Sequence, residues 1–183
     1  MIEKFQELRE ECIRRKVPII SEDKARWILN RVTEKQPRRI LELGTALGYS
    51  GCVLGSLAAE LSPIELNPKA AEEAMINFAK YEINGKIIVG NAIDIVQDLA
   101  SASRKFDLVF IDHALNQYLD ILENCVNLTK TNGIMIADNI NLQIQRRDRI
   151  LDCKDFKKAI LNHSQLETEI INIDDGLSYS RKL

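Results

Sequence analysis

Arg39-Ile-Leu-Glu-Leu-Gly-Thr-Ala-Leu-Gly-Tyr-Ser-Gly51 is the part of this sequence from which the architecture follows. Its apolar run ends at Gly44, which is typical of a buried strand that closes in a tight turn. Two further glycines, Gly48 and Gly51, precede the apolar segment 52–59, which predicts a helix. A strand, a glycine turn and a helix form the opening unit of a nucleotide-binding α/β fold.

The spacing of these glycines indicates which ligand the turn accepts. A dinucleotide-binding turn has the spacing G-x-G-x-x-G and rests a pyrophosphate on the helix N-terminus, whereas this chain has G-x-x-x-G-x-x-G just after Glu42. A carboxylate there would repel a phosphate and suit a cationic ligand. S-adenosylmethionine has no phosphate and carries an ammonium and a sulfonium, and the E-x-G-x-x-x-G form resembles motif I of the Rossmann-like methyltransferases. Glycines chosen only for packing the helix on the strand are the alternative.

Length and composition indicate one ordinary globular domain, 1–183. The chain has 183 residues, of which 45% are hydrophobic and 28% charged, and a formal net charge of −2, so it can bury a core and has no global attraction to nucleic acid or anionic membranes. No apolar run approaches the roughly 20 residues that span a bilayer. The acidic N-terminal residues, which lack an apolar h-region, are not expected to form a signal peptide, and the four cysteines are scattered without C-x-x-C spacing. A cytoplasmic protein with reduced thiols is expected.

Apolar periodicity predicts alternating helices and strands. Helices are expected over 2–15, 22–35, 68–82, 116–128 and 154–161, with another after Asn91, and strands over 40–43, 64–66, 86–89, 106–111, 134–137, 168–173 and 177–181. This alternation predicts a parallel sheet, to which the closing hairpin adds an antiparallel strand. Residues 1–36 form an N-terminal helical cap segment, Pro63 is expected at the first residues of its strand, and 140–152 is expected to be a loop.

Polar residues follow the apolar runs at the predicted strand ends, where an open α/β sheet binds its ligand. Glu65 lies 21 residues after Gly44, a position that suits hydrogen bonding to ribose hydroxyls; a surface carboxylate is the alternative. Asp112, Asp138 and Asn139 offer three hard oxygen ligands, two of them ionised, which suit Mg²⁺. Two helix caps that never contact a metal are the equal alternative.

Six motifs occur along the chain in the order typical of one enzyme family. They are Leu-Glu-Leu-Gly-Thr-Ala-Leu-Gly-Tyr-Ser (41–50), Ile-Glu-Leu-Asn-Pro (64–68), Val-Gly-Asn-Ala (89–92), Phe-Asp-Leu-Val-Phe-Ile-Asp-His (106–113), Asn-Gly-Ile-Met-Ile-Ala-Asp-Asn (132–139) and Asp-Asp-Gly-Leu-Ser (174–178). With these motifs the chain resembles the small-molecule O-methyltransferases of the catechol and caffeoyl-CoA type, over nearly its whole length.

This resemblance implies a fold, a reaction and a set of site residues. The fold would be the Rossmann-like class I methyltransferase fold, a mostly parallel seven-stranded sheet with a C-terminal antiparallel hairpin and helices on both faces. The reaction would be S-adenosylmethionine-dependent methyl transfer to a hydroxyl of a small molecule, assisted by a divalent cation such as Mg²⁺. The implied catalytic and metal-binding residues are Asp112, Asp138 and Asn139. The implied cofactor-binding residues are Ile20, Ser21, Glu42, Gly44, Tyr49, Ser50, Glu65, Asn91, Ala92, Asp112 and His113.

One position departs from the family pattern. These enzymes commonly carry a lysine three residues after the first metal-ligating aspartate, as general base for the acceptor hydroxyl, and here that position is Leu115. Leucine cannot accept a proton, so either the metal alone acidifies the hydroxyl, another group serves, or the acceptor is not catechol-like. His113 is the obvious substitute by its pKa, but its family position faces the cofactor.

Two other functions stay open. A tRNA hydroxyuridine methyltransferase is one, supported only by Arg146, Arg147 and Arg149, for which a solvated face is the simpler reading. A cofactor-binding module without catalysis is the other, suggested by Leu115. The glycine spacing and Glu42 disfavour an NAD-dependent oxidoreductase. The expected partner is a small-molecule hydroxyl acceptor, with RNA less favoured and no membrane; a homodimer is an open alternative, because family members are often dimers.

Overall fold

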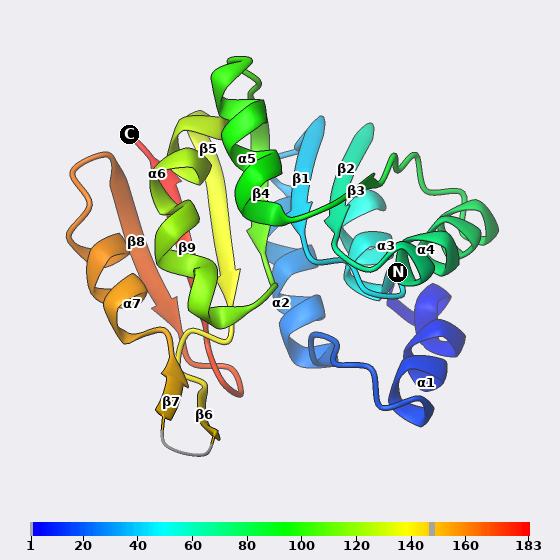
Figure 1. The fold of residues 1–183 in the computed structure, drawn as a ribbon. Helices are drawn as coiled ribbons and strands as arrows, with labels where there is room; N and C mark the ends of the chain where they lie inside the picture. Colours follow the sequence, from blue (N-terminus) through cyan, green and yellow to red (C-terminus); the bar gives the residue numbers. More distant parts are fainter. Residues whose placement is uncertain (1, 147–148) are drawn as a thin grey trace. The chain divides into compact units, whose positions relative to one another are not determined.

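The computed structural model describes residues 2–146 and 149–183, with side chains described outside 144–152. The chain divides into two compact units, Met1–Ala92 and Ile93–Leu183, and each is described by itself. Figure 1 labels the helices and strands of both units.

The first unit packs helices against three parallel strands. Its elements are η1 (Ile2–Phe5), α1 (Gln6–Arg14), α2 (Glu22–Thr33), β1 (Arg39–Leu43), α3 (Tyr49–Gly55), β2 (Glu60–Glu65), α4 (Pro68–Lys80) and β3 (Ile88–Val89). β1 pairs in parallel with β2, and β2 with β3, which gives the order β3-β2-β1. Ile40, Leu41 and Leu43 of β1 are fully buried, as expected for a strand whose faces are both covered.

Pro63 lies in the middle of β2, so its predicted place at the first residues of the strand was wrong. Backbone groups two residues apart face the same side of a strand. Leu61 accepts a hydrogen bond from the backbone N–H of Lys86, and Glu65 accepts one from that of Gly90. Pro63 therefore faces the β3 side, where β2–β3 pairing covers only two residues. A proline is tolerated there because its missing N–H removes no bond of the β1–β2 ladder.

The second unit contains four strands of the main sheet and a separate two-stranded hairpin. Its elements are α5 (Ala92–Ser101, which begins at the last residue of the first unit), β4 (Phe106–Ile111), η2 (Leu115–Gln117), α6 (Tyr118–Leu128), β5 (Thr129–Asp138), β6 (Gln143–Arg146), β7 (Arg149–Asp152), α7 (Lys154–Leu161), β8 (Leu166–Ile171) and β9 (Leu177–Lys182). β4 and β5 are parallel, whereas β9 pairs antiparallel with both β5 and β8.

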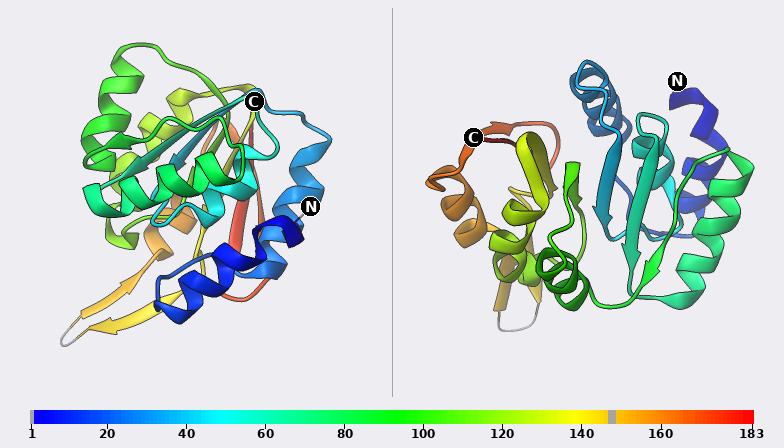
Figure 2. Two further views of the ribbon diagram at one scale, coloured as in Figure 1. Left: turned by 90° about the vertical axis from the view of Figure 1, so that its right-hand side faces the viewer. Right: turned by 90° about the horizontal axis from the view of Figure 1, so that it is seen from above.

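The segment 140–152 is not the loop that the sequence predicted. β6 and β7 pair antiparallel from Gln143 with Asp152 to Arg146 with Arg149, and Figures 1 and 2 show this hairpin projecting from the second unit. Arg147 lies outside the described residues, and the side chains of Arg146 and Arg149 lie outside the described side chains. The support that these arginines give to a tRNA-modifying function therefore stays a prediction.

The predicted fold class is confirmed. Apart from β6 and β7, the described residues form the seven strands of a mostly parallel α/β sheet with a C-terminal antiparallel pair, β8 and β9. The four cysteines, Cys12, Cys52, Cys125 and Cys153, are free and buried. The cytoplasmic location expected from the scattered cysteines stays a prediction.

Candidate active site

The segment between β1 and α3 forms a tight glycine loop. Gly44 and Gly48 have φ values of 86° and 91°, a left-handed conformation that favours glycine. The left-handed Gly48 is the N-cap of α3, so the helix begins at Tyr49 rather than near residue 52 as predicted. A Cβ atom on Gly51 would lie 2.7 Å from the Phe78 ring of α4. The glycines thus serve both the turn and the packing of α3 on α4.

Gly51→Ala tests this packing. We expect the substitution to destabilise the fold by about 1–2 kcal/mol, because the added methyl overlaps a buried ring, and this outweighs the gain in helix propensity. Phe78 is 1% exposed, so the ring cannot swing away into solvent. Urea unfolding measures the loss. Combining Gly51→Ala with Phe78→Leu should recover part of it, whereas purely additive losses would contradict the contact.

Glu42 is the buried carboxyl group beside this loop. Its side chain is fully buried, and Ser50 of α3 donates a hydrogen bond of 2.6 Å to its Oε1. Its Oε2 has no hydrogen-bond partner among the described residues. Burial raises the pKa of Glu42 to about 7, the Ser50 and Thr45 hydroxyls oppose that shift, and the negative charge of Glu65 adds to it. A cationic ligand would supply a positive charge that favours the ionised form of this buried carboxyl group.

Two more polar atoms around the glycine loop are buried without a partner among the described residues. They are the hydroxyls of Thr45 and Tyr49. Buried polar groups nearly always have a hydrogen-bond partner. The Thr45 hydroxyl lies near the Glu42 carboxyl group, whose pKa it lowers, whereas the charged neighbours of the Tyr49 hydroxyl are Arg9, Glu22 and Arg26 of α1 and α2. Glu42 and Thr45 therefore leave hydrogen-bonding capacity for a ligand beside the glycine loop.

Glu65, at the end of β2, connects the loop to α4. Its Oε2 accepts a hydrogen bond of 2.8 Å from the backbone N–H of Ala46, and its Oε1 accepts one of 2.8 Å from that of Asn67. These two bonds could not be predicted from the sequence. Each carboxylate oxygen can accept a second hydrogen bond, so binding of ribose hydroxyls by Glu65 is compatible with this arrangement and stays a prediction.

The other predicted cofactor residues of the first unit have local roles of their own. Ser21 is the N-cap of α2, and its hydroxyl accepts a 3.2 Å hydrogen bond from the Lys24 N–H. Ile20 is buried, and Asn91 and Ala92 lie where β3 leads into α5. Lys24 of α2 is only 2% exposed, which is rare for lysine and could not be predicted from the sequence. In the sequence, Lys24 is only a charged residue next to Ala25, and this does not indicate that the lysine is buried.

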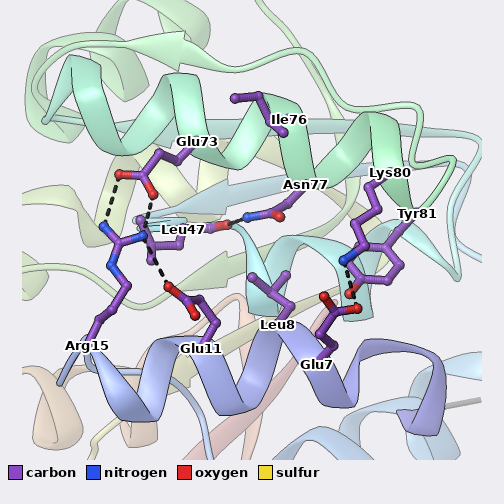
Figure 3. A pocket seen from close by; sticks show the side chains of 10 residues that line it. All are labelled: Glu7, Leu8, Glu11, Arg15, Leu47, Glu73, Ile76, Asn77, Lys80 and Tyr81. Carbon is purple, nitrogen blue, oxygen red and sulfur yellow. Dashed lines mark hydrogen bonds and ion pairs between the residues drawn. The ribbon is translucent and has the colours of Figure 1, made fainter.

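A pocket of about 290 Å³ lies between α1 and α4, beside the glycine loop (Figure 3). Arg15 pairs with both Glu11 and Glu73, and Lys80 pairs with Glu7 at 2.8 Å. The charged groups in its walls thus neutralise one another. At the loop side of the pocket, Asn77 donates a 2.8 Å hydrogen bond to the backbone carbonyl of Leu47. This bond fastens the glycine loop to α4.

In the second unit, two carboxylates follow adjacent parallel strands. Ile111 of β4 is paired with Ala137 of β5, so Asp112 and Asp138 are the next residues at the same edge of the sheet. Asp138 is 2% exposed. Both carboxylates contribute to raising the pKa of the buried Tyr118 hydroxyl, after burial itself, so both lie close to it. The structure therefore brings together the two predicted aspartates.

Asn139 is the third residue of this group. Its φ of 58° is left-handed, its backbone N–H donates to Asp138 Oδ1 at 2.7 Å, and its side-chain amide donates to Asp175 Oδ2 at 3.0 Å. Among the described residues, no group of three or more His, Cys, Asp or Glu could hold a metal. The candidate cation ligands are thus two carboxylates and one amide, a set of hard oxygen donors that fits Mg²⁺ completed by water or substrate.

His113 and Leu115 lie just after Asp112. Burial lowers the pKa of His113 to about 4, so the ring is neutral at pH 7. Its Nδ1 lies 3.2 Å from the carbonyl of Ala114, and its buried Nε2 has no partner among the described residues. A group with so low a pKa is a weak base. Leu115 begins η2 and is partly exposed.

Comparison with known proteins identifies the family. A family model described as O-methyltransferase matches residues 2–183. The chain belongs to this O-methyltransferase family. This confirms the resemblance seen in the sequence motifs.

Relatives of the O-methyltransferase family agree with this assignment. Pig catechol O-methyltransferase is 34% identical over 122 residues, which cover 60% of this chain and 63% of that enzyme. The match thus spans less than two thirds of the pig enzyme. A solved Staphylococcus aureus structure, assigned as a caffeoyl-CoA O-methyltransferase, is 27% identical with a TM-score of 0.88, over 98% of this chain and 92% of that one. An O-methyltransferase from Bacillus cereus, solved in complex with SAH, shares the fold at 20% identity, with a TM-score of 0.86 over 99% of this chain and 91% of that one.

The described part of this O-methyltransferase-family chain contains no helix with the length and apolar character needed to cross a membrane.

Proposed function

We propose that the chain is an S-adenosylmethionine-dependent O-methyltransferase that methylates a hydroxyl of a small molecule with the help of a divalent cation. The observation that carries this proposal is the buried Glu42 beside the glycine loop, with one carboxylate oxygen unpartnered among the described residues. Family membership supports the reaction class. The SAH complex of the Bacillus cereus relative supports the cofactor.

The glycine loop and its carboxylates suit the charge of this cofactor. Glu42 would face the cationic methionine end, where its unpartnered oxygen could accept a hydrogen bond from the ammonium. Glu65 would accept hydrogen bonds from ribose hydroxyls with the lone pairs that Ala46 and Asn67 leave free. Tyr49 begins α3 directly after the loop, and its contact with the cofactor stays a prediction.

The reaction needs positioning more than acid catalysis. The acceptor oxygen forms a bond to the methyl carbon as the carbon–sulfur bond breaks, the electron pair returns to sulfur, and the hydroxyl proton leaves to solvent. Because the sulfide leaving group is neutral, no acid is required. Asp112, Asp138 and Asn139 would hold the cation, which when bound supplies Lewis-acid stabilisation of negative charge on the acceptor oxygen.

Calorimetric titration tests the cofactor assignment directly. S-adenosylmethionine should bind the purified protein saturably, and NAD, the control ligand, should not. Preference for NAD, or no binding of either, would mean that Glu42 and Glu65 have other roles. Turnover on bulk tRNA, with none on small hydroxyl compounds, would instead favour the tRNA-modifying function. Cofactor binding without any turnover would favour a non-catalytic module.

Leu115→Lys tests the missing base. A positioned general base contributes about 10²–10⁴-fold to a rate, and leucine offers no proton acceptor at this site. With catechol as the probe acceptor, we expect Leu115→Lys to increase the rate of methylation on the order of 10-fold, with the gain appearing only above the pKa of the new lysine. Leu115→Met, which keeps an apolar side chain of similar size, is the matched control and should leave the rate unchanged. An equal gain in both variants would assign the effect to packing.

A further inference from the structure

Asn139 is an amide, and an amide can meet a cation in two opposite ways. Its Oδ1 can accept a hydrogen bond or coordinate a cation, whereas its Nδ2 carries two hydrogens and repels a cation. The two orientations differ by a 180° rotation of the terminal group and occupy nearly the same volume. Packing alone therefore does not select the one that suits a metal ion.

The contact between Asn139 and Asp175 makes this selection. Asn139 Nδ2 lies 3.0 Å from Asp175 Oδ2, and an ionised carboxylate can only accept hydrogen bonds. Rotating the amide would place Oδ1 against that carboxylate, two acceptors in contact. The Asp175 side chain thus holds Nδ2 on its own side and leaves Oδ1 directed to the other.

Asp175 is well placed for such a task because its own backbone is fixed to the loop that follows β5. The backbone N–H of Asn141 donates to the Asp175 carbonyl at 2.8 Å, and that of Ile140 donates to the Gly176 carbonyl at 3.2 Å. Gly176 is left-handed, with a φ of 82°, and a Cβ there would lie 2.5 Å from the Asn141 amide nitrogen. A side chain at 176 would therefore require both a strained left-handed backbone and a shift of the Asn141 side chain.

We propose that Asp175 is a positioning residue that orients the Asn139 amide so that its oxygen is presented to a divalent cation. The inference rests on the proposed function, because it presupposes a cation site in which the Asn139 amide is a ligand beside two carboxylates. It adds to this site one residue, Asp175, that does not itself bind the ion. Removing such an orienting partner typically lowers metal affinity by about 10–100-fold.

Manganese binding measures this role without any reaction. The free Mn²⁺ signal in electron paramagnetic resonance gives the Mn²⁺ dissociation constant of the full chain and its variants. Asp175→Asn keeps the shape of the side chain but lets an amide meet an amide, so both orientations of Asn139 become allowed. We expect it to weaken Mn²⁺ binding by about 10–100-fold. Asp174→Asn, which removes one negative charge from the exposed neighbouring position of the same turn, should change it less than about threefold.

The outcomes separate the inference from the proposed function. Equal weakening in both variants would show that only overall charge matters, and unchanged binding in Asp175→Asn would show that the carboxylate does not orient the ligand; either result overturns the inference and leaves cation use intact. Failure of the unaltered chain to bind millimolar Mn²⁺, with S-adenosylmethionine still bound, would overturn both. Thermal unfolding of each variant checks that the fold persists, and a large loss of stability in Asp175→Asn would itself assign Asp175 to structure.

Discussion

Replacing Asp138 by asparagine is expected to lower cation-dependent turnover by about 10²–10³-fold, the several kcal/mol that a metal ion contributes to charge stabilisation. Asp138 ends β5 beside Asp112, and its carboxylate is buried. Asparagine keeps the shape and can still accept from the Asn139 N–H through its oxygen, but it removes one of the two charges in the candidate ligand set. The loss should therefore affect the cation site while the glycine loop of the first unit is unchanged.

Three measurements establish where the effect of Asp138→Asn arises. Turnover as a function of Mg²⁺ concentration should lose its saturation, Mn²⁺ binding should weaken, and the affinity for S-adenosylmethionine in calorimetry should stay within about twofold. Asp120→Asn, at an exposed position in the first turn of α6, removes the same charge from the surface of the same unit and should behave as the unaltered chain. Parallel loss of turnover and cofactor affinity would make Asp138 a structural residue.

The ends of these strands could be predicted because the buried strand residues are almost all apolar and a polar residue follows them. The run Phe106–Ile111 contains one charged residue, Asp107, whose carboxylate is partly exposed and pairs with Lys130 at 2.7 Å. The run ends directly before Asp112, so the sequence alone predicts this edge of the sheet. Parallel pairing of the next strand then brings Asp138 beside it. These residues follow from local pattern and one topological rule.

Features that depend on contacts between distant residues could not be predicted in the same way. Glu65 bonds to the backbone of Ala46, which needs the exact conformation of the glycine loop. The amide of Asn139 bonds to Asp175, 36 residues later in the chain. The sequence predicts a loop at the β6–β7 hairpin because residues 143–152 are mostly polar and charged and show too little apolar alternation for a strand. In each case the partner, rather than the residue type, decides the structure.

Glu42→Gln is expected to remove a pH-dependent part of both stability and cofactor binding. Burial raises the pKa of Glu42 from its ordinary value of 4.5 to about 7, so between these pH values the folded chain binds more protons than the unfolded chain. The free energy of unfolding therefore falls as pH rises through this range, by up to about 3 kcal/mol in total for a shift of this size. Glutamine does not titrate, so the variant should lose this slope.

The same carboxyl group links cofactor binding to proton release. A cationic ligand favours the ionised form, so at pH 6 binding of S-adenosylmethionine to the unaltered chain should release up to one proton, and affinity should rise as the pH approaches 7. Glu42→Gln should release none and bind about 10–100-fold more weakly at pH 8, the loss expected for a hydrogen bond to a charged group. Calorimetry in two buffers of different ionisation enthalpy counts the protons, and urea unfolding from pH 4.5 to 8 gives the stability slope. Glu72→Gln, on the exposed face of α4, is the matched control and should keep both effects; if it loses them too, or if Glu42→Gln retains them, the titrating group is not Glu42.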